Sequence, residues 1–229
     1  MNASQTLDFE LARHNMIEQQ IRPWNVLDQG VLEAMTAVPR EQYTPPRFRA
    51  MAFTDTEIPL EIDGLRTGEC MFTPRVEARF LQALAIGRHE TAVEIGAGSG
   101  FMAALLAHEA SQVDTYEIVP ELAEFARANL AREGVANCQV HARDGAELLA
   151  DTGWQADVIL LSGAVAEIPA ALLDRLRPGG RLGAIVGQGP IMTARLLSLG
   201  ARREVSTEIL FETLARPLRS FPSGERFRF

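Results

Sequence analysis

The chain has 229 residues, of which 47% are hydrophobic, and its 22 basic residues against 30 acidic ones give a net charge of −8. The hydrophobic fraction excludes a disordered chain, and the acidic balance argues against a nucleic-acid partner. No apolar run approaches the ~18–20 residues that a membrane span needs. Two cysteines without a C-x-x-C pair and four scattered histidines indicate free thiols and no metal site. These properties predict a soluble cytoplasmic protein without a membrane partner, and they leave its oligomeric state open.

Residues 1–90 lack the regular alternation of strands and helices that follows them. Helical apolar spacing covers Leu11–Ile21 and Gln29–Val38, with Pro23 between them. The stretch from Pro39 to Pro74 is punctuated by proline and has too little periodicity for an assignment. Because loops of that length are usually functional or disordered, we predict that residues 1–90 form helices and a cap over a ligand site.

From residue 91 onward, strand and helix patterns alternate, which predicts a Rossmann-like α/β domain over residues 91–229. We expect a mostly parallel, twisted sheet with helices on both faces, closed by one or two strands within Arg202–Ala215. The predicted strands are Ala92–Ile95, Val113–Glu117, Gln139–Ala142, Asp157–Ser162 and Arg181–Val186, and the predicted helices are Phe101–Glu109, Glu121–Glu133 and Ile168–Leu176.

The stretch Val93–Phe101, which reads VEIGAGSGF, is a strand that passes into a helix through Gly96, Gly98 and Gly100. Such a turn lets the backbone approach a ligand and presents the free N–H groups of the helix start. A dinucleotide fingerprint needs its third glycine at the position of Phe101. The G-x-G-x-G spacing instead resembles motif I of class I methyltransferases, which bind S-adenosylmethionine. The alternative is a turn that uses glycine only for tight packing.

Two further acidic residues follow the next two predicted strands. Glu117 lies 21 positions after Gly96, a spacing that suits hydrogen bonds from a ribose diol. Asp144 follows the third strand, where a methyltransferase aspartate accepts a hydrogen bond from the adenine amino group. Glu94, within the first strand, is a candidate contact for the methionine part of the cofactor. The alternatives are a solvated glutamate at 117 and an N-cap aspartate at 144.

Nearly the whole chain resembles the protein-L-isoaspartate O-methyltransferase family. The matching segments are Met16–Pro45, Ala52–Leu60, Val93–Ala107, Tyr116–Leu130, Arg143–Trp154 and Asp157–Gly187. The resemblance implies the class I methyltransferase fold, S-adenosylmethionine as cofactor and isoaspartyl residues of damaged proteins as partners. It implies methylation of the isoaspartyl α-carboxylate, whose ester then closes to a succinimide. The cofactor-binding residues that we expect are Met71, Phe72, Glu94, Gly96, Ala97, Gly98, Ser99, Gly100, Glu117, Asp144 and Gly145.

Two segments depart from the family pattern. The family's cap motif reads roughly G-Q-T-I-S-Q-P, with the serine hydroxyl at the reacting carboxylate, whereas this chain reads G-E-C-M-F-T-P from Gly68 to Pro74. Cys70 therefore replaces the threonine and Phe72 the serine, which leaves Thr73 as the predicted catalytic hydroxyl. In the tail, an aromatic-Val-Pro-Leu strand facing the substrate peptide is replaced by Ala-Arg-Pro-Leu at 215–218.

These departures keep two alternatives open. One is a methyltransferase of the same fold with a different acceptor, for which Thr73, Arg75 and Glu77 would line the altered entrance. The simpler interpretation of those three residues is a loop hydroxyl and two solvated helix charges. The other alternative is a cofactor-binding protein without turnover.

Overall fold

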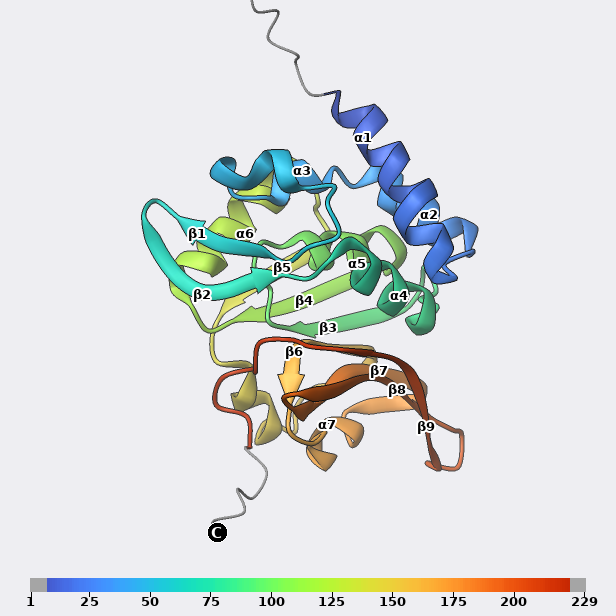
Figure 1. Cartoon of the computed structure of the whole chain (residues 1–229). Coiled ribbons are helices and arrows are strands. Elements are labelled where there is room, and N and C mark those ends of the chain that lie inside the picture. Colours follow the sequence, from blue (N-terminus) through green and yellow to red (C-terminus); the bar gives the residue numbers. More distant parts are fainter. Residues whose placement is uncertain (1–7, 223–229) are drawn as a thin grey trace, which may run out of the picture.

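A twisted sheet of seven strands forms the centre of the computed structural model, which describes residues 8–222 (Figure 1). In sheet order the strands are β5 (Cys138–Ala142), β4 (Gln112–Glu117), β3 (Thr91–Ile95), β6 (Ala156–Val165), β7 (Leu176–Gln188), β8 (Ile191–Leu199) and β9 (Val205–Thr213). The first five strands are parallel to one another, and β8 and β9 continue the sheet in antiparallel fashion. The predicted α/β class with a mostly parallel sheet is confirmed.

Helices cover both faces of the sheet because its central strands are apolar on both sides. Along β6, Val158 and Leu160 face one hydrophobic core, whereas Ile159 and Leu161 face the other. The first core contains residues of α1 (Phe9–Met16), α2 (Gln29–Ala37), α4 (Pro74–Leu84), α5 (Phe101–Glu109) and α6 (Pro120–Arg132). The second core lies under a 3₁₀ helix (Gly145–Leu149) and α7 (Ala170–Leu173).

Three elements differ from the sequence expectation. The helix predicted over Ile168–Leu176 is only α7, because Leu176 already begins β7 and pairs with Ala156 of β6. Strand β8 was not among the predicted strands, although β9 confirms a closing strand in the tail. The first helical segment is α1 followed by a π-helical turn over Ile17–Ile21.

The segment between Pro39 and Pro74, left unassigned from sequence, is largely ordered into short elements. It contains α3 (Arg40–Tyr43), a 3₁₀ helix (Pro46–Met51) and an antiparallel hairpin of β1 (Ile58–Ile62) and β2 (Leu65–Met71). The hairpin turn uses Asp63 and Gly64, both with positive φ, as a two-residue turn requires. Figure 1 shows β2 leading directly into the part of the chain that forms α4.

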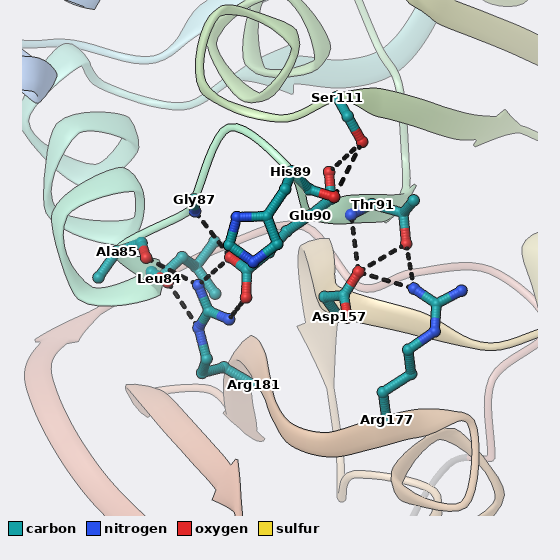
Figure 2. Close-up of polar contacts among 10 residues, drawn as sticks. All are labelled: Leu84, Ala85, Gly87, His89, Glu90, Thr91, Ser111, Asp157, Arg177 and Arg181. Atoms are coloured by element: carbon teal, nitrogen blue, oxygen red, sulfur yellow. Dashed lines mark hydrogen bonds and ion pairs between the residues drawn. The ribbon is translucent and has the colours of Figure 1, made fainter.

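Two arginines of β7 fasten the amino end of β3 to its neighbours (Figure 2). Arg177 Nη1 lies 2.7 Å from Asp157 Oδ2, which also accepts from the amide and hydroxyl of Thr91 at 2.8 and 3.0 Å. Arg181 donates to both carboxylate oxygens of Glu90 at 2.6 and 2.8 Å. It also donates to two carbonyl groups at the carboxyl end of α4, and thereby holds that helix against the sheet.

No helix within residues 8–222 is long and apolar enough to cross a membrane. The same residues contain no cluster of three or more histidine, cysteine or acidic side chains placed to hold a metal ion. Cys70 and Cys138 are both free thiols.

Candidate functional site

Two adjoining cavities open at the carboxyl ends of the parallel strands, the place where ligands bind in open α/β sheets. We call them the main cavity and the side cavity. The main cavity is lined by residues from the ends of β3, β4, β5 and β6, from the hairpin and from the tail: Leu60, Glu69, Cys70, Phe72, Ile95, Gly96, Gly98, Tyr116, Glu117, Ile118, Asp144, Gly145, Ser162, Gly163, Arg216, Pro217, Leu218, Arg219 and Phe221. The side cavity shares six of these residues and adds Met71, Glu77, Glu94, Ala97, Ser99 and Met102.

The glycine loop is folded so that its backbone forms one wall of both cavities. Gly96 and Gly98 line both, and each has a positive φ, 99° and 53° respectively. A Cβ atom at position 98 would lie 3.1 Å from Leu60 of the hairpin. The loop is therefore closed down against the hairpin, and glycine is needed both for the backbone conformation and for the space.

The other loop residues differ in how they face this space. Ala97 and Ser99 line the side cavity. Gly100, the N-cap of α5 with a φ of 82°, lines neither cavity, and a Cβ there would lie 3.2 Å from Ala126 of α6. The structure thus shows close helix packing at Gly100, and its predicted cofactor contact stays a prediction.

Glu117 joins the end of β4 to the glycine loop. Its Oε2 accepts from the amide of Gly98 at 2.8 Å, and its Oε1 accepts from the amide of Val119 at 3.0 Å. The residue is 5% exposed and lines the main cavity, and burial raises its pKa. A carboxylate in this position can accept hydrogen bonds from a bound diol, as the sequence pattern predicts.

Glu94 is fully buried beneath the glycine loop and lines the side cavity. Its two oxygens accept from the hydroxyls of Thr115 at 2.6 Å and Ser162 at 2.7 Å. Burial raises the pKa of Glu94 to about 7, against the lowering effect of those two hydrogen bonds. Glu94 is therefore a buried carboxylate without a cationic partner among the described residues. Such an arrangement favours a positively charged ligand.

Asp144 and Gly145 line the main cavity at the end of β5. Asp144 Oδ1 accepts from the amide of Ala146 at 2.9 Å, so the residue is also the N-cap of the following 3₁₀ helix. A Cβ at position 145 would lie 2.3 Å from Ile95, so only glycine fits there. Asp144 therefore both caps this helix, as the alternative interpretation of the sequence predicts, and lines the cavity.

The connection from β2 to α4, which we call the cap loop, consists of Phe72 and Thr73, and it places Phe72, not Thr73, at both cavities. Phe72 is 9% exposed, and its carbonyl oxygen accepts from Arg40 Nη2 at 2.5 Å. Thr73 is the N-cap residue of α4, and its hydroxyl is buried without a hydrogen-bond partner in the described part of the chain. Thr73 lines neither cavity, so its catalytic role stays a prediction.

Arg75 and Glu77, which the altered-entrance alternative invokes, are both engaged in ion pairs. Arg75 pairs with Asp55 at 2.9 Å and lies 4.1 Å from the ring centroid of Trp24. Glu77 is buried at the side cavity in an ion pair with Arg40, and burial raises its pKa. Arg40 thereby ties α4 to the carbonyl group of the cap loop. Glu77 is therefore not the solvated helix charge that the simpler interpretation assumes, whereas the Arg75 side chain remains 35% exposed.

The C-terminal tail forms the remaining wall of the main cavity. Pro217 makes a parallel bridge to Ala164 at the end of β6, and Ala164 exchanges backbone hydrogen bonds of 2.8 Å with Arg216 and Leu218. Farther along, Arg219 donates to Glu69 of β2 at 3.0 and 2.5 Å. The tail is thus anchored both to the sheet and to the hairpin.

The sequence of this chain matches the family model of protein-L-isoaspartate(D-aspartate) O-methyltransferase (PCMT) over residues 11–212. The protein-L-isoaspartate O-methyltransferase of Koribacter versatilis is 36% identical over 201 residues, which cover 88% of each chain. That of Methanoculleus marisnigri is 38% identical over 175 residues, 76% of this chain and 77% of the relative. The chain belongs to the PCMT family.

Solved structures support the fold of this PCMT family member. A PCMT structure from Plasmodium falciparum, in complex with S-adenosyl-L-homocysteine, has a TM-score of 0.72 at 18% identity and covers 92% of this chain and 98% of its own. A second protein-L-isoaspartate O-methyltransferase structure has a TM-score of 0.73 at 20% identity and covers 90% of this chain and 65% of its own. At such identities the likeness carries the fold alone.

Several cavity residues were missed by sequence reasoning. Ser162 and Gly163 follow the same rule as Glu117, since they end or follow a predicted strand, and could have been found by it. Tyr116 could have been found in the same way. The hairpin and tail residues, such as Leu60 and Phe221, carry no local signal because long-range packing brings them to the site.

Proposed function

We propose that this protein is an S-adenosylmethionine-dependent O-methyltransferase that methylates the α-carboxylate of isoaspartyl residues in damaged proteins. Membership of the PCMT family supports the activity, and one structural observation supports the site. The glycine loop, Glu94, Glu117 and Asp144 all meet at two adjoining cavities at the carboxyl ends of successive strands. No other described part of the chain gathers these features.

The residues present fit S-adenosylmethionine. Glycines at 96, 98 and 145 line the main cavity, where close packing against Ser162, Leu60 and Ile95 leaves no room for a Cβ atom and brings bare backbone to the cavity wall. Glu117 would hold the ribose hydroxyls and Asp144 the adenine amino group. Glu94 would face the positively charged methionine part from below the loop. The full proposed set is Met71, Phe72, Glu94, Gly96, Ala97, Gly98, Ser99, Gly100, Glu117, Asp144 and Gly145.

The chemistry makes small demands on this chain. When bound, the cofactor supplies a methyl group on a positively charged sulfur, which keeps the electron pair of the broken S–C bond as the acceptor oxygen forms its bond to carbon. The acceptor carboxylate is already ionised at pH 7, so no residue has to remove a proton. The residues therefore contribute orientation, and the hairpin, Phe72 and the tail contribute exclusion of water.

The direct test is methyl transfer from labelled S-adenosylmethionine to a peptide with one isoaspartyl residue, compared with the same peptide containing aspartate. We expect labelling of the isoaspartyl peptide alone. Transfer to neither peptide, with cofactor binding demonstrated by calorimetry, would refute the proposed acceptor. A Phe72→Ser variant that gained transfer in that case would identify position 72 as the cause.

A further inference from the structure

The charges around the main cavity are unevenly matched. Glu69, Glu117 and Asp144 line it, together with two arginines, Arg216 and Arg219. Arg219 is committed to Glu69, at 3.0 and 2.5 Å. Within residues 8–222, Arg216 has no carboxylate at ion-pair distance. Arg216 is therefore the cation of the main cavity whose charge is left for a ligand.

The backbone that carries Arg216 is firmly placed. Its carbonyl oxygen accepts from the amide of Ala164 at 2.8 Å, and the amide of Leu218 donates to the carbonyl oxygen of Ala164 at 2.8 Å. Gly163 packs so closely beneath the tail that a Cβ there would lie 2.7 Å from Leu218 and 3.2 Å from the carbonyl oxygen of Arg216. Strand pairing therefore fixes the backbone from which the Arg216 side chain starts at the cavity wall.

Arg216 lines the main cavity together with Cys70 and Phe72. Burial and, to a smaller extent, Glu57 raise the pKa of the Cys70 thiol to about 12, although the Arg216 guanidinium acts to lower it. Arg216 is thus close to Cys70, which lines both cavities two positions before Phe72. Phe72 has no hydrogen-bonding group in its side chain, so the polar contact to an acceptor must come from elsewhere.

Resting on the proposed function, we infer that Arg216 is the positioning residue that binds the carboxylate of the methyl acceptor. Acidic residues around the main cavity attract a cationic donor but repel an anionic acceptor, and Arg216 offsets that repulsion at the cavity wall. A guanidinium offers parallel N–H donors that match a carboxylate. Methylation converts the carboxylate to a neutral ester, which weakens this contact and favours release of the product.

The test compares wild-type protein with Arg216→Gln and Arg216→Lys. Binding is measured by calorimetry in the presence of S-adenosylhomocysteine, with an isoaspartyl peptide and with the same peptide carrying an α-carboxamide in place of the α-carboxylate. Wild type should prefer the carboxylate peptide, and Arg216→Gln should lose about 10- to 100-fold of its affinity for that peptide alone. Arg216→Lys should restore part of the preference. Affinity for S-adenosylhomocysteine should stay unchanged.

Arg202→Gln is the matched control, since Arg202 is an exposed arginine in the loop between β8 and β9. Equal affinities of Arg216→Gln and wild type for the carboxylate peptide would overturn the inference, as would a loss confined to S-adenosylhomocysteine. The proposed function fails separately, if wild type binds the carboxylate peptide through Arg216 but transfers no methyl group. Because Arg216 is exposed, Arg216→Gln should fold; if it does not, Arg216→Lys should still show a larger loss of affinity for the carboxylate peptide than for the carboxamide peptide.

Discussion

Acidic residues at the two ends of strand β3 have pKa values shifted in opposite directions. At the amino end, hydrogen bonding from Arg181 lowers the pKa of Glu90 (Figure 2). Burial acts to raise the pKa of Asp157 on the neighbouring strand, but hydrogen bonds from Thr91 and Arg177 outweigh it, and the pKa is lowered. At the carboxyl end, burial raises the pKa of Glu94 to about 7.

This difference distinguishes carboxylates that stabilise the fold through ion pairs from buried carboxylates that are available to a ligand. Glu90 and Asp157 find their cationic partners within the chain, so their charges stabilise the folded state. Glu94 and Glu117 are bound only by hydroxyls and amides, and the cost of burying them remains. A cationic ligand can offset that cost, and such perturbed groups are typical of functional sites.

The largest effect that we expect is a pH dependence carried by Glu94. Its pKa rises from 4.5 to about 7 on folding, so between these values the folded state keeps a proton that the unfolded state has lost. Stability should therefore fall as pH rises through this range, with Glu94 contributing as much as about 3 kcal/mol. Urea unfolding of wild type and Glu94→Gln from pH 4.5 to 8 should give curves that diverge with rising pH. The exposed control Glu124→Gln should follow the wild-type curve. If the curves of Glu94→Gln and wild type also stay parallel, the distinction between the two ends of β3 is wrong.

The next effect concerns cofactor affinity at Glu117. Loss of its carboxylate removes a charged acceptor from the main cavity, and Glu117→Ala should weaken S-adenosylhomocysteine binding on the order of 100-fold. The variant should remain folded, as near-ultraviolet circular dichroism would show. Unchanged affinity by calorimetry would refute the ribose assignment.

At the amino end of β3 we expect a substitution to lower stability and to leave cofactor affinity unchanged. Arg181→Gln leaves Glu90 without its ion pair, and both side chains are less than one-fifth exposed. The variant should lose about 2 kcal/mol of stability in urea at pH 7 while its affinity for S-adenosylhomocysteine stays at the wild-type value. Because the pKa of Glu90 is lowered in the fold, its stabilising contribution is present at neutral pH and is lost as pH falls through that lowered pKa. A large loss of affinity would show that the two ends are not independent.

The smallest effect tests the tail at the carboxyl end. Gly163→Ala introduces a Cβ 2.7 Å from the Leu218 side chain and 3.2 Å from the Arg216 carbonyl oxygen, so Leu218 must move and the tail is crowded against β6. We expect kcat/KM for an isoaspartyl peptide to fall roughly tenfold, with a smaller change in cofactor affinity. Gly153→Ala, in an exposed loop, is the control. Equal kinetics of the two variants would mean that the tail does not position the acceptor.

The strand ends were predictable and the cap was not. Glu94, Glu117 and Asp144 follow from the rule that parallel strands end at a common edge, and the structure brings all three to adjoining cavities. No such rule sets the register of the cap loop. A shift of one residue there would bring Thr73 to the cavity in place of Phe72. What fixes that choice is the hydrogen bond from Arg40 to the Phe72 carbonyl, between residues 32 positions apart.

The sequence by itself determined the parallel sheet, the glycine loop and the acidic strand ends, because periodicity and turn chemistry act between residues close together in the chain. Only the tertiary structure decided which arginines pair and which do not. Arg219 meets Glu69 across 150 positions, and Arg216 comes to the cavity through backbone pairing of the tail with Ala164. Every residue type except proline can both donate and accept backbone hydrogen bonds of this kind, so they leave little trace in the pattern of side chains.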